Sequence, residues 1–309
     1  MALNRSLIGR TVAVLMLGSA LVSCKPSASA PQQPWAAFSQ KTVDGWLAID
    51  PAFAVYEGAH QYDGKLPDWS EDGLKKKAAF LKGVIEQAKA YDNLVGNDRF
   101  ERDYMVKVAE GQLFWLEEAD QPHTNPAFYV GGGLDPNVYL TRDYADKPTR
   151  MKALIALFNN VPAAAAQIRA NLKSPLPASF IHYGTSAFGG FAEAYVTSAR
   201  EAFADVKDPA LQKQLVDSSA KAAKSMADLR DWLQSQQSSA TQDFALGPDR
   251  FAHMLAATEA VDTPIDELEK IGRADLKRNQ DALKAACGQF APGQTIQACM
   301  AKMNANKPL

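Results

Sequence analysis

Two cysteines near the end of the chain have the spacing that most favours a covalent link. Cys287 and Cys299 lie twelve residues apart, and Gly288, Pro292 and Gly293 between them favour a turn. In an exported protein such a pair favours a disulfide, which would contribute roughly 3 kcal/mol by closing a short loop. Two buried free thiols are the alternative, because spacing alone does not fix the sulfur geometry. A zinc site is less favoured, since no histidine is nearby.

The histidines do not form a zinc-binding helix by spacing. A catalytic zinc site usually takes two ligands from adjacent turns of one helix, with a carboxylate that activates the bound water. No two histidines of this chain lie within 50 residues of each other, and none is followed by glutamate. The four are His60, His123, His182 and His253. We therefore assign no catalytic residue and no metal ligand.

Two glycine-containing segments come close to catalytic motifs but differ from them in spacing. The segment from Gly184 to Gly189 is one residue too long for the G-x-S-x-G elbow, and we interpret it as a helix-packing or turn segment. The run 131–133 is three glycines, and the residues after it complete neither a dinucleotide fingerprint nor a phosphate loop. It favours a flexible turn, with a mobile loop at the rim of a cleft as the functional alternative.

A polar, glycine-rich loop is the remaining candidate site. It carries Gly58, His60, Tyr62, Asp63 and Gly64. Asp63 and Gly64 favour a turn, and His60 and Tyr62 would anchor the loop. A loop that contacts substrate is the alternative, although no partner residues for it stand out in the sequence.

The first residues have the order of a signal peptide. Arg5 and Arg10 precede an apolar run over 11–21, which is shorter than the roughly 20 residues that a membrane span requires. The following Leu21-Val22-Ser23-Cys24 resembles the lipobox of bacterial lipoproteins, in which the cysteine receives diacylglycerol. We expect residues 1–23 to be removed and Cys24 to be lipidated. A general secretory signal peptide is the alternative, and it would also direct export.

A tether is expected to join the anchor to the folded body. Residues 24–34 hold three prolines and small polar side chains, a composition that stays extended. By the pattern known for bacterial lipoproteins, Lys25 in place of aspartate favours the outer membrane. The predicted location is the periplasmic face of the cell envelope, with the membrane as a partner through the lipid.

The charge and composition of the body, residues 35–309, indicate an ordinary globular protein. Removal of residues 1–23 takes away Arg5 and Arg10 and changes the formal net charge from −2 to −4. No basic field attracts nucleic acid, so a nucleic-acid partner is not expected. The hydrophobic fraction of 47% is ordinary for a globular protein, and the body is long enough for one large domain or two small ones.

Apolar periodicity predicts helices throughout this body. A helix capped by Ser70 is indicated by apolar residues at alternating steps of four and three, namely Leu74, Ala78, Leu81, Ile85 and Ala88. For the next helix we expect Asp98 as the cap and Glu101 in the capping-box position. Its apolar face would consist of Phe100, Tyr104, Val108, Gly111 and Trp115.

Further helices are expected over 147–171, 178–206 and 208–239, and Thr263-Pro264 favours the start of another. No segment alternates with a period of two between hairpin turns, so strands are at most incidental. The predicted fold class is all-α, a multi-helix array of mostly antiparallel amphipathic helices.

Several segments of the body resemble the bacterial DUF885 family, which is linked to zinc metallopeptidases that are often exported lipoproteins. The resemblance is carried by Asp50-Pro51, Gly58-x-His60-x-Tyr62-Asp63-Gly64, Pro67-Asp68-x-Ser70, the run 150–172 with Ser174-Pro175, Trp232-Leu233, Leu246-Gly247 and Thr263-Pro264-x-x-Glu267-Leu268. It covers nearly the whole mature chain and implies the N-terminal half of a helical metallopeptidase-like fold.

The resemblance implies zinc only outside this chain. The family's His-Glu-x-x-Pro-Gly-His helix belongs to a C-terminal half, and that motif is absent from these 309 residues. We therefore expect residues 35–309 to be a truncated N-terminal domain, inactive alone, with a separate C-terminal half or a peptide as its partner. The alternative is a complete, non-catalytic lipoprotein that binds a peptide or a protein partner.

Overall fold

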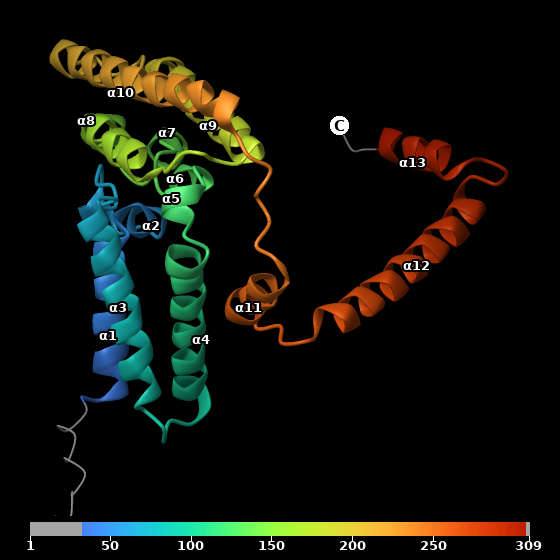
Figure 1. Cartoon of the computed structure of the whole chain (residues 1–309). Coiled ribbons are helices and arrows are strands. Elements are labelled where there is room, and N and C mark those ends of the chain that lie inside the picture. Colours follow the sequence, from blue (N-terminus) through green and yellow to red (C-terminus); the bar gives the residue numbers. More distant parts are fainter. Residues whose placement is uncertain (1–32, 307–309) are drawn as a thin grey trace, which may run out of the picture. The chain divides into compact units, whose positions relative to one another are not determined.

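The computed structural model describes residues 33–306, and its regular elements there are all helices. The only β-type pairing among these residues is an isolated bridge between Pro177 and Thr241. The predicted all-α class is therefore confirmed (Figure 1). Every helix of this described part is too short or too polar to span a bilayer.

Four helices build the N-terminal part of the body: α1 (Trp35–Ile49), α2 (Pro51–Tyr56), α3 (Glu71–Lys89) and α4 (Gly96–Leu113). The helices α3 and α4 pack side by side along their length (Figure 1). Near the start of α1, a small separate core forms from Trp35, Phe38, Ala88, Tyr91 and Val106. Its three aromatic rings lie within 5.6 Å of one another, a spacing typical of favourable ring pairs.

The start of α3 follows the predicted capping pattern. The Ser70 hydroxyl accepts a hydrogen bond from the Gly73 amide at 3.1 Å, and the Asp68 carboxylate accepts one from the Ser70 amide at 3.0 Å. Hydrogen bonds from Ser70 hold the pKa of Asp68 below its ordinary value. These bonds satisfy amides that the first turn of a helix leaves without partners.

The sequence interpretation of α4 was wrong in two respects. The helix begins at Gly96 with Val95 at the N-cap, so Asp98 lies within the first turn. Its negative charge there still stabilises the helix by interacting with the helix dipole. The expected apolar face is also partly open to solvent, because Phe100 is 70% exposed and Tyr104 is 63% exposed, although Gly111 is buried. The residues that α4 buries are Val106, Ala109 and Gly111.

Four short helical elements lie between α4 and the next long helix, which begins at Lys147. A π-helical turn, η2 (Phe114–Glu118), is followed by α5 (Gln121–Thr124), α6 (Ala127–Val130) and α7 (Asn137–Thr141). The three-glycine turn, whose tight packing is described below, joins α6 to α7.

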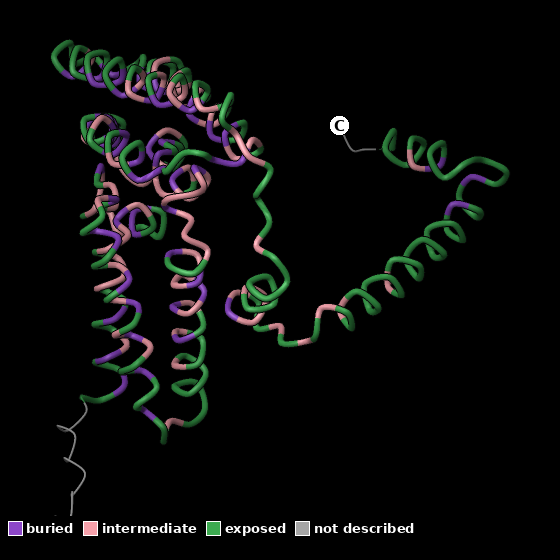
Figure 2. Tube along the Cα trace, in the orientation of Figure 1, coloured by how far each residue is buried: buried purple, intermediate pink, exposed green. Residues whose placement is uncertain are grey.

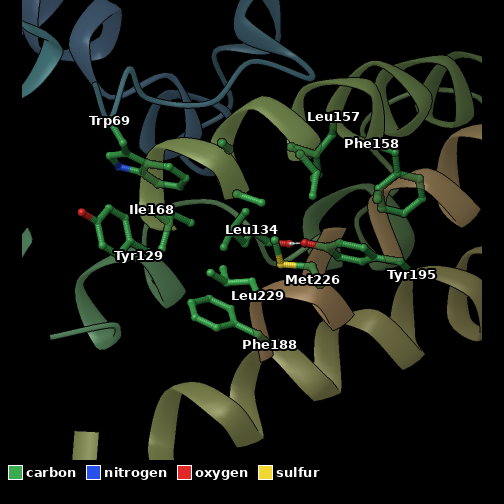
Figure 3. Packing of buried hydrophobic residues seen from close by; sticks show 14 of the residues in the cluster. Trp69, Tyr129, Leu134, Leu157, Phe158, Ile168, Phe188, Tyr195, Met226 and Leu229 are labelled. Atoms are coloured by element: carbon green, nitrogen blue, oxygen red, sulfur yellow. Dashed lines mark hydrogen bonds between the residues drawn. The ribbon is translucent and has the colours of Figure 1, made fainter. Parts of the chain in front are cut away.

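The main core lies where α10 (Pro209–Ser235) packs on both α8 (Lys147–Asn171) and α9 (Ala178–Ala202). All three were predicted, although α9 ends four residues before the expected boundary. Figure 2 shows buried residues along α8 next to exposed ones, as expected for a helix that packs one broad face into the core. In Figure 3 the Tyr195 ring lies against Phe158 at 4.8 Å, and its hydroxyl donates to the Leu134 carbonyl at 2.7 Å.

The remaining elements are η3 (Gln236–Ser239), α11 (Pro248–Glu259), α12 (Ile265–Phe290) and α13 (Ile296–Ala305). The helix α11 packs against α4 and η2, and α12 packs with α13. The N-cap of α12 is Pro264, one residue after the expected Thr263. Although α12 is strongly amphipathic, Cys287 is its only buried residue (Figure 2).

A disulfide joins α12 to α13, as the sequence favoured. The Cα atoms of Cys287 and Cys299 lie 5.7 Å apart, and the two cysteines form a small core with Ala291. This core is separate from the main one, so the disulfide is the principal link that holds α13 in place.

Reduction should therefore loosen α13 alone. Loss of about 3 kcal/mol of loop-closure stabilisation predicts roughly 100-fold faster amide exchange in α13. Hydrogen exchange read by mass spectrometry, with and without reductant, measures this. The amides of α8 are the internal control, because α8 contains no cysteine. Unchanged protection of α13 after complete reduction would contradict the prediction.

Candidate functional site

The family-motif loop is closed by a small polar network. The short helix η1 (His60–Tyr62) brings His60 Nδ1 to 3.1 Å from Asp63 Oδ1. The hydroxyl of Tyr144 donates to the other oxygen of Asp63 at 3.0 Å, and its ring stacks on the His60 ring at 3.5 Å. Burial, together with this hydrogen bond to Asp63, raises the pKa of Tyr144, so that the phenol stays protonated and keeps donating.

The end of the same loop is pressed onto α8. Gly64 has a φ of +75°, and a Cβ at this position would lie 2.5 Å from the Ala156 Cβ. Its amide donates to the Tyr139 hydroxyl at 2.9 Å, and its carbonyl accepts from the Asn160 side chain at 2.8 Å. Burial raises the pKa of Tyr139 to about 12.

These contacts give each motif residue a position. His60, Asp63 and Gly64 are held by the contacts just described, and Tyr62 is half-buried against the main core. Gly58 has a φ of +92° with open space around it. The interpretation of the loop as an anchored turn therefore fits the structure. Its partners Tyr139 and Tyr144 lie about 80 residues further along the chain, and no motif in the sequence indicated them.

The three-glycine turn is a site of close packing. A Cβ on Gly132 would lie 2.6 Å from the Trp69 ring, and one on Gly133, whose φ is +111°, would lie 2.2 Å from the Ala52 Cβ. Gly131 faces open space. The close contacts at Gly132 and Gly133 require glycine, whereas Gly131 leaves one edge of the turn free.

That free edge borders a cavity of about 630 Å³. Its other walls are formed by α2, by Lys65 after the motif loop, and by α7 with the following Arg142. A volume of this size is typical of small-molecule sites. The cavity therefore brings together the glycine turn and two cationic side chains, Lys65 and Arg142, that sequence analysis did not single out.

The other histidines serve as links between helices. His123 lies between two carboxylates, with Nδ1 facing Asp120 and Nε2 2.8 Å from Glu71. The hydrogen bond from His123 lowers the pKa of Glu71. His253 on α11 lies 2.6 Å from Glu118. Over residues 33–306, no three His, Cys, Asp or Glu side chains gather in a way that could hold a metal ion.

The one remaining predicted site is Cys24, and the one remaining histidine is His182. Cys24 lies outside the described residues, so its lipidation stays a prediction. His182 is exposed on α9, and within the described residues it forms no hydrogen bond with the motif loop.

Comparison with known proteins gives one family and one fold. No curated protein matches the chain. A solved structure of a candidate lipoprotein of unknown function from Shewanella oneidensis has a similar fold, with a TM-score of 0.71 and 19% identity. The match covers 84% of this chain and 49% of the solved chain, so this chain spans about half the length of that protein. The model of a family described as bacterial proteins of unknown function, DUF885, matches residues 51–309. Because this match takes in well over half of the sequence, the chain belongs to the DUF885 family.

Proposed function

We propose that this chain is the helical, N-terminal portion of a periplasmic lipoprotein metallopeptidase, and that the zinc-binding residues are supplied by polypeptide outside it. On this proposal the chain hydrolyses no peptide alone. Its role is to form one part of the peptidase and to carry the membrane anchor.

The observation that carries the proposal is the open apolar face of α12. At helical spacing, Ile265, Leu276, Leu283 and Phe290 fall on one stripe. Leu276 is 57% exposed and Phe290 is 47% exposed. A 26-residue amphipathic helix gains most of its stability by packing such a face, so α12 is suited to contact further protein.

Two further facts support the proposal. The solved protein of the same fold is about twice as long as the matched region, which leaves room for a second half. The disulfide between Cys287 and Cys299 suits an oxidising compartment such as the periplasm. The signal-peptide pattern at the N-terminus agrees with that location.

A complete, non-catalytic lipoprotein that binds a peptide is the second candidate. The cavity beside the motif loop favours it, because a binding protein needs such a site and no second half. The two candidates differ in what they require of α12, since only the first needs its apolar face to be covered by more protein.

The test uses the chain from residue 25 onward. We expect it to retain no stoichiometric zinc after dialysis, to hydrolyse none of a mixed set of dipeptides and oligopeptides, and to self-associate at micromolar concentration through α12. The double variant Leu276→Glu/Leu283→Glu should be monomeric in sedimentation velocity, because each leucine contributes about 2 kcal/mol when buried.

The matched control is Ala274→Glu/Ala285→Glu, which adds the same charge to the opposite, exposed face of α12. It should associate like the unmodified chain. If the unmodified chain is monomeric, the exposed apolar face of α12 no longer supports the proposal. One bound zinc per chain with chelator-sensitive turnover would overturn the proposal outright.

A further inference from the structure

The cavity beside the motif loop has an imbalance of charge that its volume alone does not reveal. Two carboxylates border it, and only Asp50 has a cation beside it. Asp50 caps α2 through the Phe53 amide at 3.2 Å and lies 3.6 Å from Lys77. Asp135 accepts a hydrogen bond from the Asn137 amide at 2.9 Å.

The two cations at the cavity have no such partners. Within residues 33–306, neither Lys65 nor Arg142 forms an ion pair with a carboxylate. The carboxylate next to Arg142 in sequence, Asp143, is bound by Arg150 at 2.9 Å instead. The Nζ of Lys65 lies over the Tyr62 ring, 5.1 Å from the ring centre. The cavity therefore has two cations without ion pairs against one such carboxylate, Asp135, so a net positive charge remains among the described residues.

Arg142 is also held in place. Its guanidinium lies 4.2 Å from the centre of the Tyr56 ring, and one nitrogen donates to the Tyr56 carbonyl at 2.5 Å. A guanidinium carries five N–H donors in a rigid plane, so most of them remain available. A fixed planar donor set matches the two oxygens of a carboxylate, and less ordering entropy is lost on binding.

Another part of the wall is apolar. Phe53, which is 49% exposed, lines the cavity with Val55, Val130 and Val138. A ligand that fits both parts would join a carboxylate to a short apolar group, as the last residue of a peptide does. An inorganic anion would satisfy the cations but leave Phe53 in water.

From this geometry we propose that the cavity binds the C-terminal carboxylate of a short peptide that ends in an apolar residue, with Arg142 and Lys65 as the anion-binding side chains. The site names the ligand group for the cavity that favours the second candidate function, and it does not depend on where a zinc ion is held. Its failure is distinguishable, since it is tested by binding without hydrolysis and without reference to α12.

The experiment is calorimetric titration of the chain from residue 25 onward, which contains the whole helical body, with N-acetyl-alanyl-leucine. The same peptide with a C-terminal amide should bind at least about tenfold more weakly, because it lacks the charge that strengthens the hydrogen bonds. Arg142→Ala should weaken binding of the acid by at least about tenfold and Lys65→Ala by about threefold. Arg142→Lys should retain part of the affinity, since it keeps the charge and loses the planar fork.

Arg169→Ala is the matched control, because Arg169 is likewise exposed and likewise lies over an aromatic ring, that of Trp232, outside the cavity. It should bind the peptide like the unmodified chain. Thermal unfolding followed by circular dichroism checks that each variant is folded. If Arg142→Ala does not fold, Arg142→Lys is used to test the role of Arg142.

Three results would overturn the proposal. The first is no binding of the acid at millimolar concentration, and the second is equal binding of acid and amide. The third is tighter binding of inorganic phosphate than of the peptide acid, which would make the cavity a site for phosphate groups. An unchanged affinity in both Arg142 variants would likewise remove Arg142 from the site.

Discussion

Replacing Gly64 by alanine should lower the free energy of unfolding by about 4 kcal/mol. Two effects add at this position. An alanine at a φ of +75° is strained, and its Cβ would lie 2.5 Å from the Ala156 Cβ and 3.0 Å from backbone atoms of α8. Because a helix backbone does not yield as a side-chain tip does, the loop must move and its bonds to Tyr139 and Asn160 are lost with it.

Gly58→Ala is the matched control in the same motif. Its φ of +92° imposes a similar backbone strain, but no atom lies within 4 Å of the new Cβ. We expect a loss of only about 1 kcal/mol there. Urea unfolding of both variants, followed by circular dichroism, gives the comparison. Equal losses at the two positions would mean that packing against α8 does not explain why Gly64 is a glycine.

Replacing Cys24 by alanine should release the protein from membranes almost completely. Only a thiol at this position can receive the diacylglycerol that lipoprotein processing requires, and a serine or alanine leaves no other anchor in the predicted tether. Nearly all of the unmodified protein is expected in the membrane fraction of the producing cells. The variant should accumulate as unprocessed precursor or as soluble protein, read by fractionation and immunoblotting.

The double variant Cys287→Ser/Cys299→Ser controls for general loss of thiols. It removes the disulfide, leaves the lipobox intact and should still fractionate with membranes. A Cys24→Ala variant that reaches membranes at mature size with acyl chains attached would show that the lipoprotein assignment is wrong.

Much of the helical framework is readable from the sequence, because a helix that buries one face repeats its apolar residues every three to four positions. The start of α3 after Ser70 and the extent of α8 follow from such local patterns of apolar residues, caps and prolines. The link between Cys287 and Cys299 was also favoured from sequence, because the turn between the two cysteines is short. Membership in the DUF885 family was likewise indicated by motifs in the sequence.

Periodicity does not tell whether a face has a partner. The apolar stripe of α4 was expected to be buried, yet Phe100 and Tyr104 are exposed, since the rows that α4 buries run through Val106 and Ala109. The same applies to α12, whose pattern is that of a packed helix although it buries only Cys287. The position of neighbouring helices decides burial, and a single helix does not encode it.

The cavity was not readable from sequence for a related reason. Lys65 and Arg142 are far apart in the chain and belong to no common motif, and they line one cavity because the loop after η1 and α7 both pack against α8. The motif residues His60, Asp63 and Gly64 stood out by their types, but their partners Tyr139, Tyr144 and Asn160 did not. Sequence alone thus determined which segments become helices and where the chain turns, because those choices depend on neighbours within a few residues. Only the tertiary structure decided which charges remain unpaired and which cavity they face, because pairing depends on distances between segments that local chemistry does not set.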